Sequence, residues 1–231
     1  MAANIVPNKF ILEEINYFPS VVNGRINFIL FIKASSDLLI LIGMFSMFNK
    51  YILNEILDIY IKRFADRLGK IFTPVKQDIQ GNIDKINKYY KYDENSCLLE
   101  LMLEEVKNGK PLGAEGVLWL NRALLFFELT FHGILDNLKS DPNEVNMKKV
   151  YISAYEGSVK KYHGWMTQQL FNTMCRMAPT LPQIIKSFEV ENNINIFESK
   201  LSIFNEALHL VRWEIDKFFE NNNLFTNNFV P

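Results

Sequence analysis

Apolar residues recur at helical spacing along almost the whole of this 231-residue chain. One segment, for example, has its apolar positions at Val75, Ile79, Ile83 and Ile86, which share one face of a helix. Only ten glycines and eight prolines interrupt such segments, so the chain offers few turns. No alternating strand pattern of useful length occurs. The sequence therefore predicts an all-α fold.

Breaks in the apolar pattern divide the chain into separate helices. We predict an irregular leader over residues 1–27, with a short helix near 10–17, and one domain over residues 28–231. Thr73-Pro74 opens a helix, because Thr is a good N-cap and Pro suits the first helical position. The other predicted helices cover residues 28–48, 51–68, 96–106, 117–138, 145–177 with a bend near Gly164, and 194–221.

The most apolar stretch, residues 28–48, contains polar residues at its centre, namely Lys33, Ser35, Ser36 and Asp37. A membrane-spanning helix needs about 20 mostly apolar residues, and each central charge costs it about 2.5–3.5 kcal/mol. We therefore interpret this stretch as a buried amphipathic helix.

The charge balance and the cysteines exclude several classes of protein. A net charge of −1 with scattered Lys and Arg argues against nucleic-acid binding, which needs a basic surface. Cys97 and Cys175 lie far apart without metal-ligand spacing, which predicts neither a disulfide framework nor a metal site and fits a reducing compartment. The first residues lack the pattern of a signal peptide. These features predict a cytoplasmic protein.

Three polar residues share one face of the helix that Thr73-Pro74 opens. Asp78, Asn82 and Lys85 lie at i, i+4 and i+7, within roughly 60° of one another. An acceptor, an amide and a cationic donor suit a polyhydroxylated group better than a phosphate, which favours several Arg or Lys. The same trio also fits the solvated surface of an amphipathic helix.

Trp119 and Arg122 lie three residues apart in an apolar segment. An indole can stack against a sugar ring, and it packs equally well in a core. Arg122 needs a partner, because an unpaired buried charge is costly, and a structural Glu or Asp would serve.

The run KKYHGW carries His163 and Trp165. A neutral His163 can donate a hydrogen bond to a carbonyl or be a structural residue. Trp165 suits either a core or a membrane interface, beside Lys160 and Lys161.

Three of these segments together resemble the glycolipid transfer protein family. The segment LGKIFTPVKQDIQGNIDKINK, residues 68–88, is similar to that family's second-helix signature. VLWLNRAL resembles its tryptophan-bearing helix, and AYEGSVKKYHGW resembles its histidine segment. Residues 31–45 are similar to its first helix. The resemblance covers residues 31–45 and 68 to the C-terminus.

The resemblance implies a two-layer helical sandwich that encloses a hydrophobic lipid pocket. It implies a protein that binds a single glycosphingolipid, a simple glycosylceramide, and transfers it between membranes without chemical change. Such a protein is not an enzyme and needs no cofactor. Its expected partners are the lipid and a transient membrane surface, and we expect a cytoplasmic, peripheral monomer.

The family's residue roles carry over to five matching positions. Asp78 would accept from the ceramide amide N–H, and His163 would donate to the acyl carbonyl. Asn82 and Lys85 would bind sugar hydroxyls, and Trp119 would stack under the first sugar ring. Additional headgroup or membrane contacts are expected from Arg122, Tyr155, Trp165 and Phe229.

The chain also departs from the family pattern. About twenty extra residues, 46–67, form a predicted inserted helix. Phe229 lies in a tail where the family has a tyrosine, so it lacks a hydroxyl, and Asn121 replaces a lysine.

Three alternatives remain at this stage. The chain could carry ceramide-1-phosphate, with Lys85 and Arg122 on the phosphate, or it could be a sphingolipid sensor or scaffold that signals through a partner. A hydrolase built on Asp78 and His163 is disfavoured, because no nucleophile, second carboxylate pair or metal set accompanies them.

Overall fold

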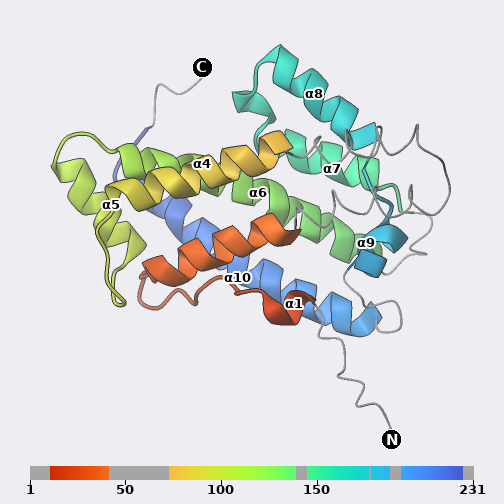
Figure 1. Ribbon diagram of the computed structural model, residues 1–231, viewed down its shortest axis with the longest axis horizontal. Coiled ribbons are helices and arrows are strands. Elements are labelled where there is room, and N and C mark those ends of the chain that lie inside the picture. Colours follow the sequence, from red (N-terminus) through yellow and green to blue (C-terminus); the bar gives the residue numbers. More distant parts are fainter. Residues whose placement is uncertain (1–10, 42–72, 139–144, 177, 188–193, 226–231) are drawn as a thin grey trace, which may run out of the picture.

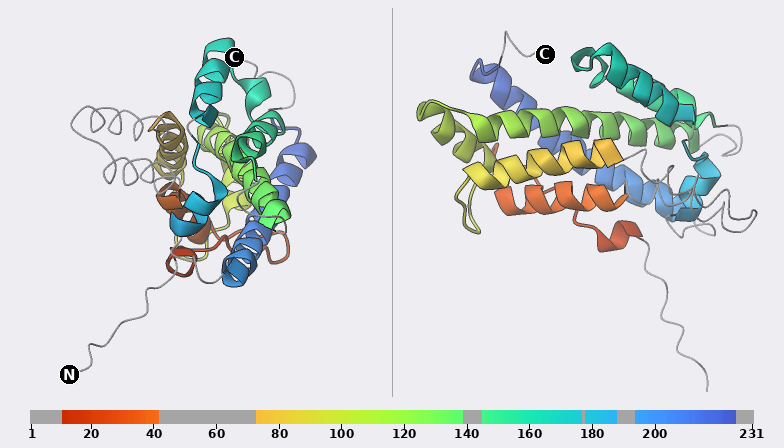
Figure 2. Two further views of the ribbon diagram at one scale, coloured as in Figure 1. Left: turned by 90° about the vertical axis from the view of Figure 1, so that its right-hand side faces the viewer. Right: turned by 45° about the horizontal axis from the view of Figure 1, so that its top comes forward.

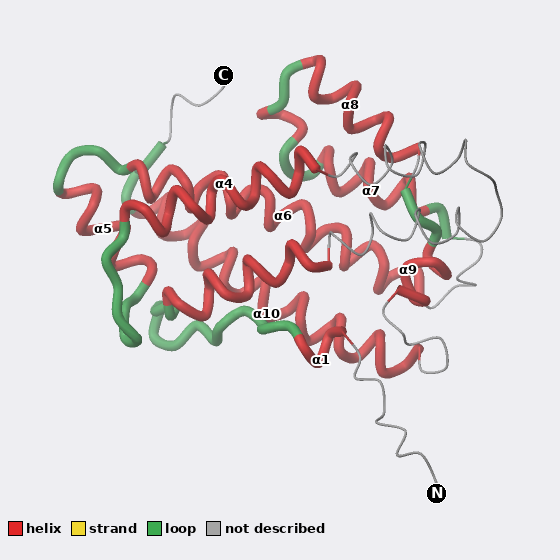
Figure 3. Tube along the Cα trace, in the orientation of Figure 1, coloured by secondary structure: helices red, strands yellow, loops and turns green. Residues whose placement is uncertain are grey.

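The computed structural model describes residues 11–41, 73–138, 145–176, 178–187 and 194–225 (Figure 1). Residues 28–41 form one helix. The labelled helices are α1 (Ile11–Glu14), α4 (Thr73–Tyr89), α5 (Leu98–Lys107), α6 (Leu112–Leu138), α7 (Met147–Glu156), the 3₁₀-helix η1 (Lys160–Tyr162), α8 (Trp165–Arg176), α9 (Leu181–Ser187) and α10 (Ile194–Asn221). The described residues contain no strand, only isolated bridges at Val22–Arg25 and Asn27–Cys97 (Figure 3).

The helices form two layers, as the family resemblance implied. In the left view of Figure 2, α4 and residues 28–41 lie on one side, and α6, α7 and α10 lie on the other. α6 packs against α4, α5, α7 and α10, so it is the central helix of the fold. α8 packs against α7 and lies at one edge of the molecule (Figure 1).

Two glycines of α6 allow α4 to approach closely. A Cβ at Gly113 would lie 2.7 Å from the ring of Tyr90, and one at Gly116 would lie 3.1 Å from Ile86. Gly113 thus faces Tyr90, which directly follows α4, and Gly116 faces Ile86 within α4. The two helices therefore run antiparallel. Glu105 of α5 completes the junction, because its carboxylate accepts hydrogen bonds from the backbone N–H groups of Gly113 and Ala114 and from the hydroxyl of Tyr90. A carboxylate in this place satisfies free N–H groups at the start of α6.

Aromatic side chains fill the interface between the layers. Phe204 of α10 contacts Phe18 of the leader and Phe131 of α6 in edge-to-face geometry, with ring centroids 5.8 and 5.9 Å apart. Phe18 also contacts Phe31 in the helix of residues 28–41. All four rings are buried. The described part of the leader therefore contributes to the main core.

Two of the polar residues inside the apolar stretch 28–48 form hydrogen bonds that account for their place. Asp37 accepts hydrogen bonds from the backbone and side-chain amides of Asn16, both at 2.7 Å, and so ties the leader to this helix. Ser36 donates to the carbonyl of Ile32. These contacts explain why Asp37 and Ser36 are tolerated on a helix whose other face is buried.

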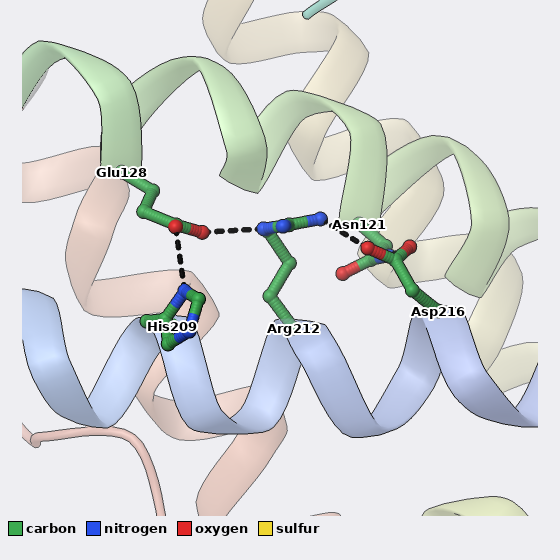
Figure 4. A network of polar contacts seen from close by, with 5 residues as sticks. All are labelled: Asn121, Glu128, His209, Arg212 and Asp216. Atoms are coloured by element: carbon green, nitrogen blue, oxygen red, sulfur yellow. Dashed lines mark hydrogen bonds and ion pairs between the residues drawn. The ribbon is translucent and has the colours of Figure 1, made fainter.

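A polar network joins α6 to α10 (Figure 4). Glu128 of α6 pairs with Arg212 and, at 2.7 Å, with His209. Arg212 also pairs with Asp216, whose other oxygen accepts a hydrogen bond of 2.6 Å from Asn121. Glu128 and Arg212 are largely enclosed, with 13% and 11% of their side chains exposed, so the ion pair between them offsets the cost of enclosing both charges.

Most predicted helices are confirmed. The last helix has the predicted bounds, 194–221, and the predicted helix at 96–106 is observed at 98–107. The helix opened by Thr73-Pro74 and the short leader helix are also present. The predicted helix at 51–68, the end of the one at 28–48 and the proposed insertion at 46–67 lie outside the described residues.

One predicted helix assignment is wrong, and another has the correct end but starts too late. The segment 145–177 is not one bent helix, because α7 ends at Glu156 and α8 begins at Trp165, with η1 between them. Ser158 contributes to this break, since its hydroxyl donates back to the carbonyl of Ala154. The helix predicted from 117 begins at Leu112, because its glycines, which disfavour an isolated helix, are the points of contact with α4.

Alanine substitutions at two helical glycines should change stability in opposite directions. Gly113→Ala should lower the free energy of unfolding by about 1–3 kcal/mol, because the new methyl group would overlap the buried ring of Tyr90. Gly81→Ala should raise it by about 0.5–1 kcal/mol, because a Cβ there meets no atom within 4 Å. Urea denaturation measures both. Equal effects of the two variants would contradict the close packing of α4 on α6.

Removing the charge of Glu128 should weaken the contact between α6 and α10. Glu128→Gln should lower the free energy of unfolding by about 2 kcal/mol, because the enclosed Arg212 loses the more enclosed of its two carboxylate partners and keeps Asp216. Glu206→Gln, an exposed position of α10, is the control and should change stability by less than about 0.5 kcal/mol. Thermal unfolding followed by circular dichroism compares the two, and equal melting temperatures would refute the role of the network.

Candidate functional site

A cavity of about 210 Å³ lies between α4, α6, α7 and α8. Its apolar lining includes Val75, Ile79, Ala123, Phe126, Phe127, Leu170, Phe171 and Met174. Four polar side chains also line it, from Asp78, Tyr155, His163 and Thr167. The cavity is thus an apolar space with a small polar region, the usual character of a small-molecule site.

Asp78 and His163 act on each other electrostatically at this cavity. Desolvation raises the pKa of the Asp78 carboxyl above 3.8, and the nearby His163 partly offsets this increase. Desolvation lowers the pKa of His163 below 6.5, and the charge of Asp78 partly offsets that decrease. Asp78 is exposed by surface area, but neighbouring protein atoms still displace much of the water around it. At neutral pH His163 is therefore neutral, and it can donate one hydrogen bond.

Hydrogen bonds hold His163 in place. Its Nδ1 lies 2.9 Å from the hydroxyl of Tyr155, and its backbone carbonyl accepts from Gln168 at 2.7 Å. Burial raises the pKa of Tyr155 to about 12, so the phenol keeps its proton and can donate it to Nδ1. The ring of Tyr155 stacks on Phe171 with centroids 3.8 Å apart. With Nδ1 accepting, the imidazole proton is on Nε2.

Trp119 forms a cluster with Tyr162 and Arg122, and the ammonium of Lys161 lies 5.0 Å from the outer part of this cluster, the ring of Tyr162. The ring of Trp119 contacts Tyr162 edge-on, with centroids 5.7 Å apart. The guanidinium of Arg122 lies 4.5 Å from the ring of Trp119 and 3.7 Å from that of Tyr162. The prediction that Arg122 pairs with a Glu or Asp is wrong for the part of the chain that the structure describes, where Arg122 forms no ion pair. Stacking on two electron-rich ring faces supports the charge instead.

Asn82 and Lys85 continue the polar face of α4 beyond Asp78. The amide of Asn82 donates to the carbonyl of Asp78 at 2.9 Å, which leaves its oxygen available. Lys85 forms an ion pair with Glu115 of α6. Trp119 lies one turn after Glu115 on α6, so the polar face of α4 and the aromatic cluster adjoin across the α4–α6 contact.

The four residues expected to make additional headgroup or membrane contacts lie in different parts of the molecule. Tyr155 lines the cavity and Arg122 stacks on Trp119. Trp165 begins α8 and is 74% exposed, beside Met166 at 77%, so it is part of an outer surface and not of the cavity. Phe229 lies outside the described residues.

Three residues of this region were missed from the sequence, namely Glu115, Tyr162 and Gln168. Glu115 precedes Trp119 by four residues and Arg122 by seven, the same spacing as in the polar trio of α4. That signal was available, but the predicted helix began two residues too late to include Glu115. The roles of Tyr162 and Gln168 depend on contacts between segments, which spacing does not reveal.

Comparison with known proteins identifies the family. The family model described as glycolipid transfer protein matches residues 54–190, which is more than half of the chain. The chain belongs to the glycolipid transfer protein family.

Relatives in the glycolipid transfer protein family agree with this assignment. The glycolipid transfer protein of Xenopus tropicalis is 36% identical over 137 residues, which cover 55% of this chain and 65% of the relative. That of Danio rerio is 36% identical over 131 residues, or 52% of this chain and 61% of the relative. The match thus spans somewhat less than two thirds of these proteins. The human pleckstrin homology domain-containing family A member 8 is 27% identical over 179 residues, 71% of this chain and 33% of that protein.

Solved structures share the fold of this family member. FAPP2, described as selecting simple glycosphingolipids with the GLTP fold, superposes with a TM-score of 0.67 at 19% identity, covering 95% of both chains. The fungal glycolipid transfer protein HET-C2 gives 0.68 at 19% identity, covering 92% of this chain and 94% of its own. Mouse ceramide-1-phosphate transfer protein gives 0.69 at 13% identity, covering 93% and 94%. The fold therefore does not distinguish sugar-headed from phosphate-headed ligands.

None of the described helices is long and apolar enough to cross a membrane. The described residues also contain no group of three or more His, Cys, Asp or Glu side chains placed to hold a metal ion.

The coupling of Asp78 with His163 should be measurable by titration. His163 should titrate below 6.5 in the wild type, and its pKa should fall further in Asp78→Asn, because the favourable negative charge is lost. NMR of the imidazole carbons follows the titration. Because the folded pKa is below that of the unfolded chain, His163 lowers stability as the pH falls below about 6.5.

Asp84→Asn is the control for this titration, because Asp84 is exposed on the same helix and is not among the residues that line the cavity. It should leave the pKa of His163 unchanged. A His163 that titrates above 6.5, or that does not respond to Asp78→Asn, would contradict the described pairing.

Proposed function

We propose that this protein binds one glycosphingolipid and transfers it between membranes without chemical change. Membership of the glycolipid transfer protein family supports this proposal. The observation that carries it is the placement of Asp78 and His163 together on the wall of an apolar cavity. An anionic acceptor and a neutral donor in that position complement an amide, which has one N–H and one C=O.

The ceramide amide is the group that these two residues would bind. Asp78 would accept from the amide N–H, and Nε2 of His163 would donate to the acyl carbonyl. Tyr155 would support this role, because a hydrogen bond donated by its hydroxyl to Nδ1 leaves the imidazole proton on Nε2. Diacylglycerol lipids lack the N–H and would leave Asp78 unsatisfied, which disfavours them.

The sugar would lie on the polar face of α4 and the ring of Trp119. Stacking with Arg122 and Tyr162 fixes the orientation of Trp119 before the ligand binds, which reduces the entropy lost on binding. The free oxygen of Asn82 and the ammonium of Lys85 would accept from and donate to hydroxyls.

The hydrocarbon tails would enter the apolar part of the cavity. Each CH₂ group removed from water is worth about 0.8 kcal/mol, so a two-chain lipid does not leave a bilayer readily unless a protein shields its tails. Phe126, Phe171 and their apolar neighbours on the cavity wall would contact the tails.

A transient membrane contact would occur through the start of α8. Trp165 and Met166 are the most exposed large apolar side chains among the described residues, and an exposed indole suits the interfacial region of a bilayer. The proposed protein is a cytoplasmic monomer that attaches to membranes peripherally. It makes and breaks no bond, so it is a carrier and not an enzyme.

Substitution of Asp78 tests the proposed site. Asp78→Val should slow the transfer of glucosylceramide or galactosylceramide between vesicles by at least about tenfold, because hydrogen bonds to a charged group contribute about 1.5–3 kcal/mol. Fluorescent lipids in donor and acceptor vesicles measure the rate.

Asp84→Val is the matched control, since it places the same side chain at an exposed position of the same helix. It should transfer at the wild-type rate. Normal transfer by Asp78→Val, with the helical circular dichroism spectrum retained, would exclude the assigned site. Equally rapid transfer of phosphatidylcholine by the wild type would exclude selection through the amide.

A further inference from the structure

The ion pair between Lys85 and Glu115 lies beside the proposed sugar site. It is partly enclosed, with 31% of the Lys85 side chain and 21% of the Glu115 side chain exposed. The exposed pair of Arg25 with Glu100, in comparison, has 52% and 59% exposed. The contact of Lys85 with Glu115 is therefore less screened by solvent than an ordinary surface ion pair.

The glycine next to Glu115 places this pair at the closest approach of α4 and α6. A Cβ at Gly116 would lie 3.3 Å from the backbone oxygen of Asn82 and 3.5 Å from the Cβ of Lys85. Glu115 therefore lies on α6 next to Asn82 and Lys85, two of the residues proposed to bind sugar. Trp119 follows one turn later, toward the end of α4 that carries Asp78.

We infer that Glu115 is a specificity-determining residue of this site, which admits neutral sugar headgroups and rejects headgroups that carry phosphate or sulfate. The inference rests on the proposed function. Glu115 acts in two ways. It forms an ion pair with Lys85, and it adds a second negative charge to that of Asp78.

A sugar hydroxyl suits the ion pair as it stands. Oε2 of Glu115 accepts from Lys85, so Oε1 can accept from a hydroxyl. The ammonium of Lys85 keeps further N–H groups that can donate to a neighbouring hydroxyl. Both partners remain paired when a sugar binds.

An anionic headgroup meets the opposite situation. To reach Lys85 it must displace Glu115, which leaves a partly enclosed carboxylate without its cation. It would also approach two negative charges, those of Glu115 and Asp78, and like charges at an interface disfavour binding. Two further cations lie near the aromatic cluster. Arg122 is already stacked on Tyr162 and Trp119, and the ammonium of Lys161 lies 5.0 Å from the ring of Tyr162. The site thus discriminates by repulsion as well as by fit.

A vesicle transfer assay with three ceramides of equal acyl length tests this inference. Galactosylceramide is neutral, its 3-sulfate is anionic with the same sugar, and ceramide-1-phosphate is anionic without a sugar. The wild type should transfer galactosylceramide faster than either anionic lipid. Glu115→Gln keeps the size of the side chain and removes its charge, so it should raise the ratio of anionic to neutral transfer by roughly five- to tenfold.

Two further variants separate charge at this position from charge in general. Glu115→Asp keeps the carboxylate and should retain the wild-type preference. Glu100→Gln removes one negative charge from the exposed pair with Arg25 and should leave the ratio unchanged.

Each remaining outcome overturns the inference. An unchanged ratio in Glu115→Gln, an equal loss of transfer for all three lipids, or equal rates for anionic and neutral lipids in the wild type would show that Glu115 does not set selectivity. Neutral transfer that depends on Asp78 would still support the proposed function in these cases. A wild type that transfers none of the three lipids would refute both.

Discussion

Close antiparallel packing of α4 against α6 is the constraint on which the rest of the structure depends. Gly113 and Gly116 remove the side chains that would keep the helices apart, and Glu105 holds the start of α6 in register by accepting its free N–H groups. This register places the polar face of α4 beside Glu115 and Trp119. A wider separation would break the pair of Lys85 with Glu115 and open the cavity beside Asp78.

The site lies at the boundary between a packed interior and a thin polar rim. Inside, phenylalanines from α6 and α8 line the apolar cavity. At the rim, most polar groups already have a protein partner, as His163 has Tyr155 and Lys85 has Glu115. Such partners orient the side chains in advance, and they also limit which headgroups can bind.

Spacing within single helices could be predicted from the sequence, and contacts between helices could not. The last helix and the helix of the polar trio follow from local periodicity and helix-end signals, which act over a few residues. The start of α6 was placed too late because glycine weakens an isolated helix, whereas here its small size is what the packing requires. The prediction of a carboxylate partner for Arg122 was wrong for a related reason, because local spacing does not reveal an aromatic ring in a distant segment.

The sequence by itself determined the all-α class, the family resemblance and the identity of the five proposed binding residues. These properties depend on residue type and short-range order, which the chain carries directly. Only the tertiary structure decided that Asp78 and His163 line one cavity, that the hydroxyl of Tyr155 lies within hydrogen-bond distance of Nδ1 of His163, and that Lys85 pairs with Glu115. Those relations join residues 8 to 85 positions apart, and they arise only when packing brings separate helices within hydrogen-bond distance or within range of a charge.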